Sequence, residues 1–317
     1  MGWNGLRDRF KGSAIGTFVG DAMGRVVEGW PASAIRRSFG ILEEMVEGVY
    51  TDDTEMMMGI MESLCEAGSF DPSLIARKFL HNFNPARGYG GRIYGVMDRL
   101  RRGVPWNQAG TDSWGNGSAM RVAPIGLFFY DDPVKLKEAA VQSSMITHQH
   151  PKGIAGAVAQ ATAVGIATRK GLRGESIEVE GFTDLIIEGV VEIDQEMADQ
   201  LERIKGIEGG DLRATIEAIG SHFSCDVSAI GAVPPAIASF LLTRGFKESV
   251  VVAVNCGGDT DTLGAMSGAI AGAYYGYTHI PRQWLMPLEN EGKGRDYILS
   301  LAERLAGCKV RNIDQRE

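Results

Sequence analysis

The sequence predicts a mostly helical, all-α fold for this chain of 317 residues. In most segments apolar residues recur at helical spacing, whereas the strict alternation of apolar and polar residues that indicates strands is rare. The chain also lacks the regular alternation of strands and helices that is typical of parallel α/β proteins. Glycine is unusually frequent, at 42 residues, but only 11 prolines accompany it and no G-X-Y period occurs, which excludes collagen.

Five helices are predicted in the first part of the chain. Three of them follow or begin at a proline, which suits the first turn of a helix because the N–H that proline lacks would be unsatisfied there. In order, they are 6–19 with Leu6, Phe10 and Phe18, 54–67 with Met57, Ile60 and Leu64, 73–83 after Pro72, 132–146 from Asp132 and Pro133, and 154–168 after Pro151.

Five more helices are predicted in the remainder, at 197–204, 212–219, 227–242, 262–275 and 297–305. Residues 43–50 favour a short strand, and residues 250–254 fit either a strand or a buried helix. Residues 175–184 and 207–211 are expected to be polar loops. Because no glycine- and serine-rich linker or long run of charges divides the chain, residues 1–317 are expected to form a single domain.

Charge and composition argue against several classes of protein. The 32 basic and 40 acidic residues give a net charge of −8, so no general attraction to nucleic acid or to anionic membranes is expected. No apolar stretch reaches the roughly 20 residues of a bilayer span, and the first residues do not resemble a signal peptide. The four cysteines contain no C-x-x-C pair, which favours reduced thiols. We therefore expect a cytoplasmic protein without membrane or nucleic-acid partners.

Two acidic motifs, YTDDTE at 50–55 and GGDTDT at 257–262, each precede a predicted helix. Capping of helix N-termini by Asp and Thr is the alternative explanation, but one helix start needs only one cap, and capping does not explain why the same set occurs twice. Clustered carboxylates repel one another unless a cation neutralises them, and oxygen ligands favour hard ions such as Mg²⁺, Mn²⁺ or Ca²⁺. If the two loops meet, four carboxylates and two hydroxyls could hold two ions roughly 3.5–4 Å apart.

Three further segments carry chemical signals. GDAMGRVVE at 20–28 places acidic residues on either side of a glycine-containing break, although a simple helix end explains it as well. SWGNGSAMR at 113–121 resembles a tight turn entering a helix, whose exposed N–H groups could hold phosphate. THQHP at 147–151 contains two histidines that could bind a metal, but loop histidines more often form hydrogen bonds or face water, and no zinc-site pattern accompanies them.

Taken together, the five segments resemble the ADP-ribosylglycohydrolase family. GDAMGRVVE, TDDT, GNGSAMR, TH-x-HP and NCGGDTDTLGAMSGAIAGAYYG occur in that order over nearly the whole chain. The resemblance implies an all-α orthogonal helical bundle with a binuclear centre in a central cleft, so two Mg²⁺ or Mn²⁺ ions are the expected cofactors. It also implies a monomer that cleaves the glycosidic bond between ADP-ribose and an acceptor, which is a protein side chain or a small conjugate.

The resemblance assigns roles to individual residues. Glu28 corresponds to a glutamate near the metals and the scissile ribose, and Glu28, Asp53 and Asp259 are the catalytic candidates. Trp114 occupies a position that is often aromatic and could stack on a ring of the substrate. The expected metal ligands are Thr51, Asp52, Asp53, Asp259, Asp261 and Thr262, and the expected substrate-binding residues are Ser113, Trp114, Gly115, Asn116, Gly117 and His148.

Two other functions fit part of the pattern. A non-catalytic ADP-ribose-binding or crystallin-like member of the same fold is one, but the retention of Glu28 and all six expected ligands argues against it. A two-metal nucleotide phosphohydrolase fits the carboxylates but leaves the other three motifs unexplained. Residues 84–112 are expected to shape the acceptor end of the cleft, and their sequence leaves open whether arginine, serine, a nucleobase or an acetyl ester is released.

The excess of glycine divides into two groups. One is expected in loops whose backbone approaches ions or phosphate, and the other is expected to let two helices pack closely around a buried centre. The loop group is Gly20, Gly24, Gly115, Gly117, Gly257 and Gly258, and the helical group is Gly153, Gly156, Gly165, Gly264, Gly268, Gly272 and Gly276.

Overall fold

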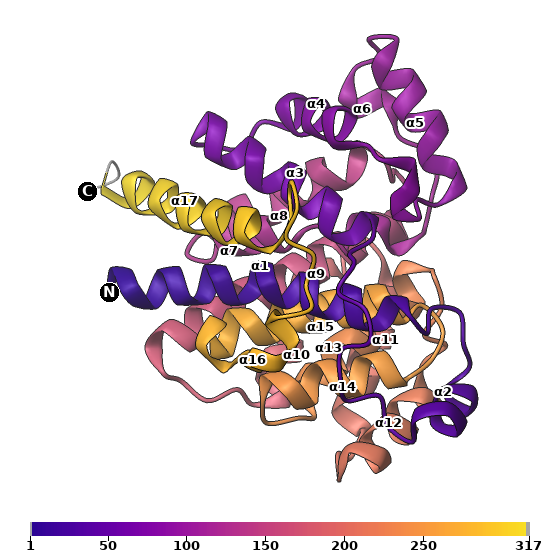
Figure 1. Cartoon of the computed structure of the whole chain (residues 1–317). Coiled ribbons are helices and arrows are strands. Elements are labelled where there is room, and N and C mark those ends of the chain that lie inside the picture. The colour runs from indigo at the N-terminus through magenta and orange to yellow at the C-terminus, as the bar shows by residue number, and fades with distance from the viewer. Residues whose placement is uncertain (1, 315–317) are drawn as a thin grey trace.

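The computed structural model describes residues 2–314, and helices are the only extended regular elements within that range (Figure 1). Strand-like pairing in the described chain is confined to isolated bridges, such as the one between Gly115 and Ser228. The predicted all-α fold is therefore confirmed. The extreme ends of the predicted domain, residue 1 and residues 315–317, lie outside the described residues.

Seventeen α-helices follow one another along residues 2–314, joined by loops and short 3₁₀ turns. They are α1 (Trp3–Arg25), α2 (Ala32–Phe39), α3 (Asp52–Ala67), α4 (Pro72–Asn82), α5 (Gly91–Arg101), α6 (Trp106–Ala109), α7 (Ala123–Phe128), α8 (Pro133–Met145), α9 (Pro151–Arg173), α10 (Val179–Val190), α11 (Gln195–Glu202), α12 (Leu212–His222), α13 (Ala229–Leu241), α14 (Phe246–Asn255), α15 (Thr260–Tyr275), α16 (Arg282–Leu285) and α17 (Arg295–Asp314).

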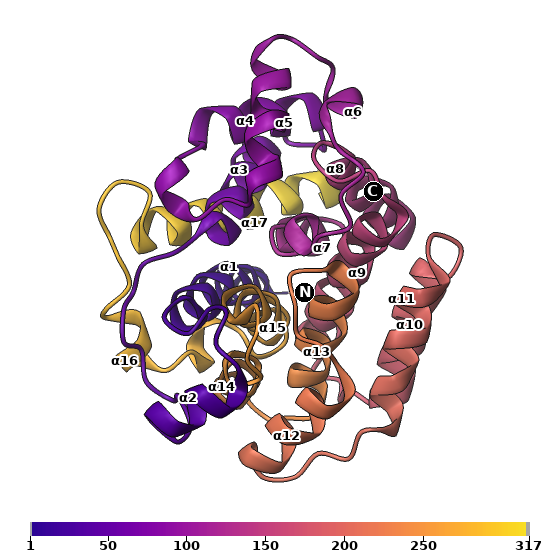
Figure 2. The same ribbon diagram turned by 90° about the vertical axis from the view of Figure 1, so that its right-hand side faces the viewer.

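Helices α1 and α15 lie side by side at the centre of the bundle (Figure 2). Their contact is made by backbone, because a Cβ built on Gly16 would overlap the carbonyl of Gly268, and a Cβ on Gly268 would overlap the carbonyl of Gly16. The pairs Gly12 with Gly272 and Gly20 with Gly264 are related in the same reciprocal way. We call these three pairs the glycine seam. The distance between packed helices depends on the side chains at their contact, and at these three pairs there are none.

The other helices surround this central pair. Helices α9, α13 and α14 pack against α15, and α3 and α17 pack against α1 (Figure 2). Helices α4, α5 and α6 lie together beyond α3, and α10 and α11 form an outer edge beside α9. The buried apolar side chains form one connected core through these layers. No helix among the described residues is both long and apolar enough to cross a membrane.

Several local predictions are wrong, each for a physical reason. Residues 43–50 form a loop because their polar groups bond to side chains and turns elsewhere, as when Glu289 N–H donates to Gly48 O. For residues 250–254 the sequence left a strand and a buried helix open, and the buried helix is correct, because these residues are the buried part of α14. Residues 175–184 include the start of α10, whose polar face is simply solvated. Gly20 and Gly24 belong to α1 rather than to a loop, because they pack against the backbone of α15.

Candidate metal and substrate site

A cleft of about 290 Å³ opens where the starts of α3 and α15 meet the 3₁₀ turn Asn116–Ser118. It gathers most of the predicted site residues. The walls are formed by Glu28, Thr51, Asp52, Asp53, Met56, Gly88, Gly90, Gly91, Arg92, Ile93, Val96, Thr111, Ser113, Gly115, Asn116, Gly117, Met120, Arg121, Thr147, His148, Val227, Asp259, Asp261 and Thr262.

The first acidic motif forms the N-terminal end of α3. Thr51 caps the helix: its Oγ1 accepts from Asp53 N–H at 3.4 Å and donates to Asp53 Oδ2 at 3.2 Å. The capping explanation is therefore correct as far as it goes. It does not account for Asp53 Oδ1, which is buried and has no hydrogen-bond partner. A buried carboxylate oxygen without a partner is costly, so this atom is available to a cation.

The second acidic motif reaches the same place from the start of α15. Thr262 Oγ1 lies 3.5 Å from Asp53 Oδ2, which joins the two motifs directly. Carboxylate oxygens of Glu28, Asp259 and Asp261 lie within 4.8 Å of one another. Six predicted metal ligands and Glu28 therefore converge on one end of the cleft. Every donor in this set is an oxygen, which suits Mg²⁺ or Mn²⁺ better than zinc.

The electrostatics of this cluster are those of unneutralised carboxylates. Burial, reinforced by Asp21, raises the pKa of Asp52 to about 8. Burial and the neighbouring carboxylates also raise the pKa values of Asp53 and Asp261 far above their ordinary range. Burial and then Asp259 raise the pKa of Glu28. Bound cations would remove this repulsion and return the carboxylates to the charged form.

Asp21 supports the first acidic motif and was absent from the predicted site residues. Both of its carboxylate oxygens accept from Thr51 N–H at 3.0 Å, and Oδ2 also accepts from Thr54 Oγ1 at 2.5 Å. Burial raises the pKa of Asp21 to about 6, although these hydrogen bonds lower it. The signal was present in the GDAMG motif, but a sequence does not show that residue 21 reaches residue 51.

The glycines of the second motif are required by close backbone contacts. Gly257 and Gly258 have positive φ angles of 78° and 76°. A Cβ on Gly258 would overlap the carbonyl oxygen of Cys225. The same oxygen accepts a hydrogen bond from Asp259 N–H at 2.8 Å. Glycine thus lets the chain fold back and place Asp259 at the cleft.

The predicted substrate turn lies directly beside the second acidic motif. Asn116 Nδ2 donates to Asp259 Oδ2 at 2.5 Å, which ties the turn to the second acidic motif. Ser113, Gly115, Gly117 and His148 line the cleft beside it. Trp114 is placed differently: its side chain does not line this cleft, is half exposed, and lies with its ring centroid 5.8 Å from Lys152 Nζ.

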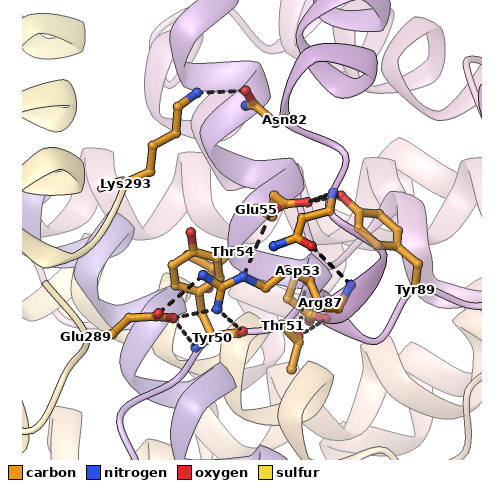
Figure 3. A network of polar contacts seen from close by, with 12 residues as sticks. Tyr50, Thr51, Asp53, Thr54, Glu55, Asn82, Arg87, Tyr89, Glu289 and Lys293 are labelled. Atoms are coloured by element: carbon orange, nitrogen blue, oxygen red, sulfur yellow. Dashed lines mark hydrogen bonds and ion pairs between the residues drawn. The ribbon is translucent and has the colours of Figure 1, made fainter. Parts of the chain in front are cut away.

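A network of polar contacts joins the start of α3 to Arg87, Tyr89 and Glu289 (Figure 3). Arg87 donates to Glu289 Oε1 at 2.6 Å and to Tyr50 O at 2.9 Å, and its guanidinium carbon lies 3.5 Å from the centroid of the Tyr50 ring. Glu55, in the first turn of α3, accepts from the hydroxyl of Tyr89 at 2.7 Å. The loop before α5 and the segment before α17 are thereby fixed to the first acidic motif.

The fold and the cleft define a helical protein with a cluster of carboxylate and hydroxyl oxygens that could hold a cation. The family model for ADP-ribosylglycohydrolase matches residues 3–313, and the chain belongs to this family. The predicted family resemblance is therefore confirmed.

Individual relatives match along nearly their whole length. ADP-ribosylhydrolase ARH3 of Xenopus tropicalis is 31% identical over 91% of this chain and 93% of its own. The ADP-ribosyl-(dinitrogen reductase) glycohydrolase of Rhodospirillum rubrum is 28% identical over 94% of this chain and 97% of its own. A solved structure, an ADP-ribosylglycohydrolase-related protein complex, has a TM-score of 0.74 at 28% identity, covering 96% of this chain and 99% of that chain.

Proposed function

We propose that this protein is a metal-dependent glycohydrolase that releases ADP-ribose from an ADP-ribosylated protein side chain or a small ADP-ribose conjugate. The observation that carries the proposal is the meeting of the two acidic motifs, through Thr262 and Asp53, in a cleft that the Asn116–Ser118 turn also lines. Family membership and the names of the relatives support the same reaction class.

The proposal includes two divalent cations, Mg²⁺ or Mn²⁺. The all-oxygen donor set and the unpartnered buried Oδ1 of Asp53 fit such ions. Bound there, the cations would neutralise the carboxylates, orient ribose hydroxyls and acidify a coordinated water. The residues that would hold them are Thr51, Asp52, Asp53, Asp259, Asp261 and Thr262.

The protein's own groups would bind the substrate and move the proton. ADP-ribose is anionic, and this chain carries a net charge of −8, so uncharged donors near the pyrophosphate are an advantage. Within the Asn116–Ser118 turn, the N–H groups of Gly117 and Ser118 are the candidates for this role. The N–H groups of Gly115 and Asn116 already donate to Ser113 Oγ and to Val227 O. Cleavage at ribose C1 builds oxocarbenium character and needs proton transfer, for which Glu28, at the cation cluster with a raised pKa, is the first candidate.

Three substrates test the reaction class: ADP-ribosyl-arginine, ADP-ribosyl-serine and O-acetyl-ADP-ribose, each with and without Mg²⁺. Release of free ADP-ribose that depends on Mg²⁺ supports the proposal and identifies the acceptor. Binding without turnover would instead support a non-catalytic member of the fold. Release of AMP or phosphate would support a two-metal phosphohydrolase.

Replacement of Glu28 tests the role of this carboxylate. We expect Glu28→Gln to lower kcat by about 100-fold or more, since positioned general acid–base groups contribute at least that factor. The thermal shift caused by Mg²⁺ serves as the control, because it should survive the substitution. Near-normal turnover in the variant would transfer the role to Asp53 or Asp259.

A further inference from the structure

Arg121 carries a buried positive charge in the wall of the cleft. Its side chain is completely buried, and its guanidinium carbon lies 4.8 Å from the centroid of the Phe79 ring. Within residues 2–314, the hydrogen bonds of this guanidinium go to neutral groups and none to a carboxylate. Burial lowers the pKa of Arg121 to about 9. A buried charge without an opposite partner is costly, so its neutral contacts must offset that cost.

These neutral contacts join two walls of the cleft. Arg121 donates to Gly117 O at 3.0 Å, in the substrate turn, and to Ser143 O at 2.9 Å, in α8. It also donates to Thr147 Oγ1 at 2.8 Å. Thr147 is itself buried, and its Oγ1 lies 2.6 Å from Nδ1 of His148. The result is a hydrogen-bond chain from Arg121 through Thr147 to His148.

The direction of this chain follows from what each group is able to do. A guanidinium donates only, so the Thr147 oxygen accepts from Arg121 and has one proton of its own to give. If that proton points to His148 Nδ1, the Thr147 hydroxyl uses both its acceptor and its donor, and His148 Nδ1 is satisfied as an acceptor. Nδ1 is then an acceptor, and the neutral imidazole carries its proton on Nε2. Burial, followed by the charges of Arg121 and Arg92, lowers the pKa of His148 to about 3 and keeps the ring neutral.

The Nε2 side of the ring faces the substrate turn. A Cβ on Gly117 would lie 3.2 Å from Nε2, and a Cβ on Gly115 would lie 3.5 Å from it. His148 also lines the cleft, and its main chain is fixed by an N–H that donates to Ser144 O at 2.8 Å. Backbone and Nδ1 are thus both held, and the remaining ring nitrogen is the one beside the turn.

We propose that Arg121 and Thr147 are positioning residues that hold His148 as the neutral tautomer protonated at Nε2, so that a fixed N–H donor faces the ligand beside Gly117. The inference rests on the proposed function for the identity of the acceptor, an oxygen atom of bound ADP-ribose. Neither Arg121 nor Thr147 needs to touch the reacting atoms in this arrangement.

The tautomer can be read directly by long-range ¹H–¹⁵N correlation NMR of the full-length protein labelled with ¹⁵N-histidine, with His148 assigned through His148→Gln. We expect an unprotonated Nδ1 and a protonated Nε2 that do not titrate between about pH 5 and 8, in contrast to an ordinary histidine. A proton on Nδ1, or a charged ring at neutral pH, would overturn the proposal. His150, whose Nδ1 accepts from Lys152 N–H at 3.1 Å, is an internal reference.

Two substitutions at Thr147 test the chain itself. Thr147→Val keeps the shape but removes the hydroxyl, so the Nδ1 signal should shift towards a mixture of tautomers, while Thr147→Ser should restore it. For the substrate that the wild type hydrolyses, kcat/KM should fall about tenfold in Thr147→Val, as expected for one lost hydrogen bond, and recover in Thr147→Ser. An unchanged His148 spectrum in Thr147→Val would contradict the proposal. If the wild type hydrolyses none of the three ADP-ribose substrates, the proposed function fails, and the NMR result still decides the tautomer.

Discussion

At the scale of single residues, the cleft depends on carboxylates that are stable only with a counter-charge. Asp53 shows this most clearly, because Oδ2 bonds to both threonines of the predicted ligand set while Oδ1 is buried without a partner. No side-chain cation of the protein fills that role within the described residues. If the site binds metal as proposed, metal binding is expected to stabilise the folded chain.

Metal removal should reveal this coupling. We expect Mg²⁺ to raise the melting temperature of the wild type, because a ligand present at 100 times its Kd stabilises the native state by about 2.7 kcal/mol. Asp53→Asn should be at least as stable as the wild type in EDTA, since the substitution relieves repulsion, and should lose the rise caused by Mg²⁺. Thermal unfolding with Mg²⁺ and with EDTA measures both effects.

The matched control is Glu192→Gln, which removes one negative charge at an exposed position. It should keep the full thermal response to Mg²⁺. If Asp53→Asn responds to Mg²⁺ as strongly as Glu192→Gln does, the assignment of Asp53 as a ligand is wrong.

The identity of the site residues could be predicted from sequence better than their contacts. The motifs identified Thr51, Asp53 and Asp259 because carboxylates paired at a helix start can be recognised from neighbouring residues in the sequence alone. Asp21 was missed as a supporting residue because its role depends on the approach of α1 to the start of α3, which only tertiary structure provides. The metal, catalytic and substrate roles themselves stay predictions.

At the scale of helices, the glycine seam between α1 and α15 determines how the site is assembled. Asp21 lies near the end of α1, and Asp261 lies in the first turn of α15. Because the two helices touch through backbone at the glycine seam, no side-chain rearrangement there can change their separation. A change in the separation of the two helices would therefore change the distance between these two carboxylates.

Substitution within the seam should destabilise the fold strongly. A Cβ at Gly268 would overlap the carbonyl of Gly16, so Gly268→Ala should lower the free energy of unfolding by about 3 kcal/mol or more, as severe overpacking does. Gly268→Leu should be worse. Urea denaturation followed by circular dichroism measures the change, and an unchanged midpoint for either variant would contradict close packing at the seam.

Gly220→Ala is the matched control for this experiment. Gly220 lies inside α12, and a Cβ there would meet nothing within 4 Å. Replacement of an unconstrained helical glycine by alanine stabilises a helix by about 0.5–1 kcal/mol. Opposite signs for Gly220→Ala and Gly268→Ala would separate packing from helix propensity.

Helical periodicity predicted most of the central helices. It left residues 250–254 undecided between a strand and a helix, and it missed the start of α10. Residues 250–254 are a continuous apolar run, and such a run fits a buried strand or a buried helix equally well. The start of α10 looked like a loop because its apolar face is narrow. Residues 43–50 alternate like a strand but find no partner strand within residues 2–314.

At the scale of the whole molecule, the segment before α17 fastens the C-terminal part of the chain to α3 and α4. Lys293 donates to Glu62 Oε1 at 2.5 Å and to Asn82 Oδ1 at 2.7 Å. Glu62 also accepts from the hydroxyl of Tyr297 at 2.6 Å. Burial alone would raise the pKa of Glu62, but the hydrogen bonds from Lys293, Tyr297 and Asn82 outweigh it and lower the pKa.

Loss of Lys293 should destabilise the molecule in a pH-dependent way. Lys293→Met leaves the buried Glu62 without its cation and should lower the free energy of unfolding at pH 7 by about 1–3 kcal/mol. Because the folded-state pKa of Glu62 lies below its ordinary value of 4.5, its stabilising effect is complete above that pH. It is lost as the pH falls through the lower folded pKa, so wild type and variant should converge in acid.

Denaturation curves measured in steps from pH 7 down through the acid range follow this convergence, which begins only below the ordinary glutamate pKa because the pKa of Glu62 is lowered. The control is Lys205→Met, which removes surface ion pairs with Asp184 and Glu202 and should lower stability less than Lys293→Met does, because solvent screens such pairs. A difference between Lys293→Met and wild type that stays constant with pH would show that Glu62 is not the partner that matters.

The order of the five motifs predicted the family, while the domain organisation, the oligomeric state, the cellular location and the partners stay predictions. These are a single domain over residues 1–317, a monomer, a cytoplasmic location and the absence of nucleic-acid partners. They depend on properties of the surface and of the cell that helical periodicity and local motifs do not encode.

The glycine seam also has a genetic consequence. Every missense change in a glycine codon specifies a residue that carries a Cβ, so Gly12, Gly16, Gly20, Gly264, Gly268 and Gly272 have no conservative replacement. In a saturation-mutagenesis library selected for folded protein, these codons should tolerate synonymous changes alone, while the exposed helical glycines accept alanine. The centre of this protein is therefore encoded by codons at which every change of amino acid adds an atom for which there is no room.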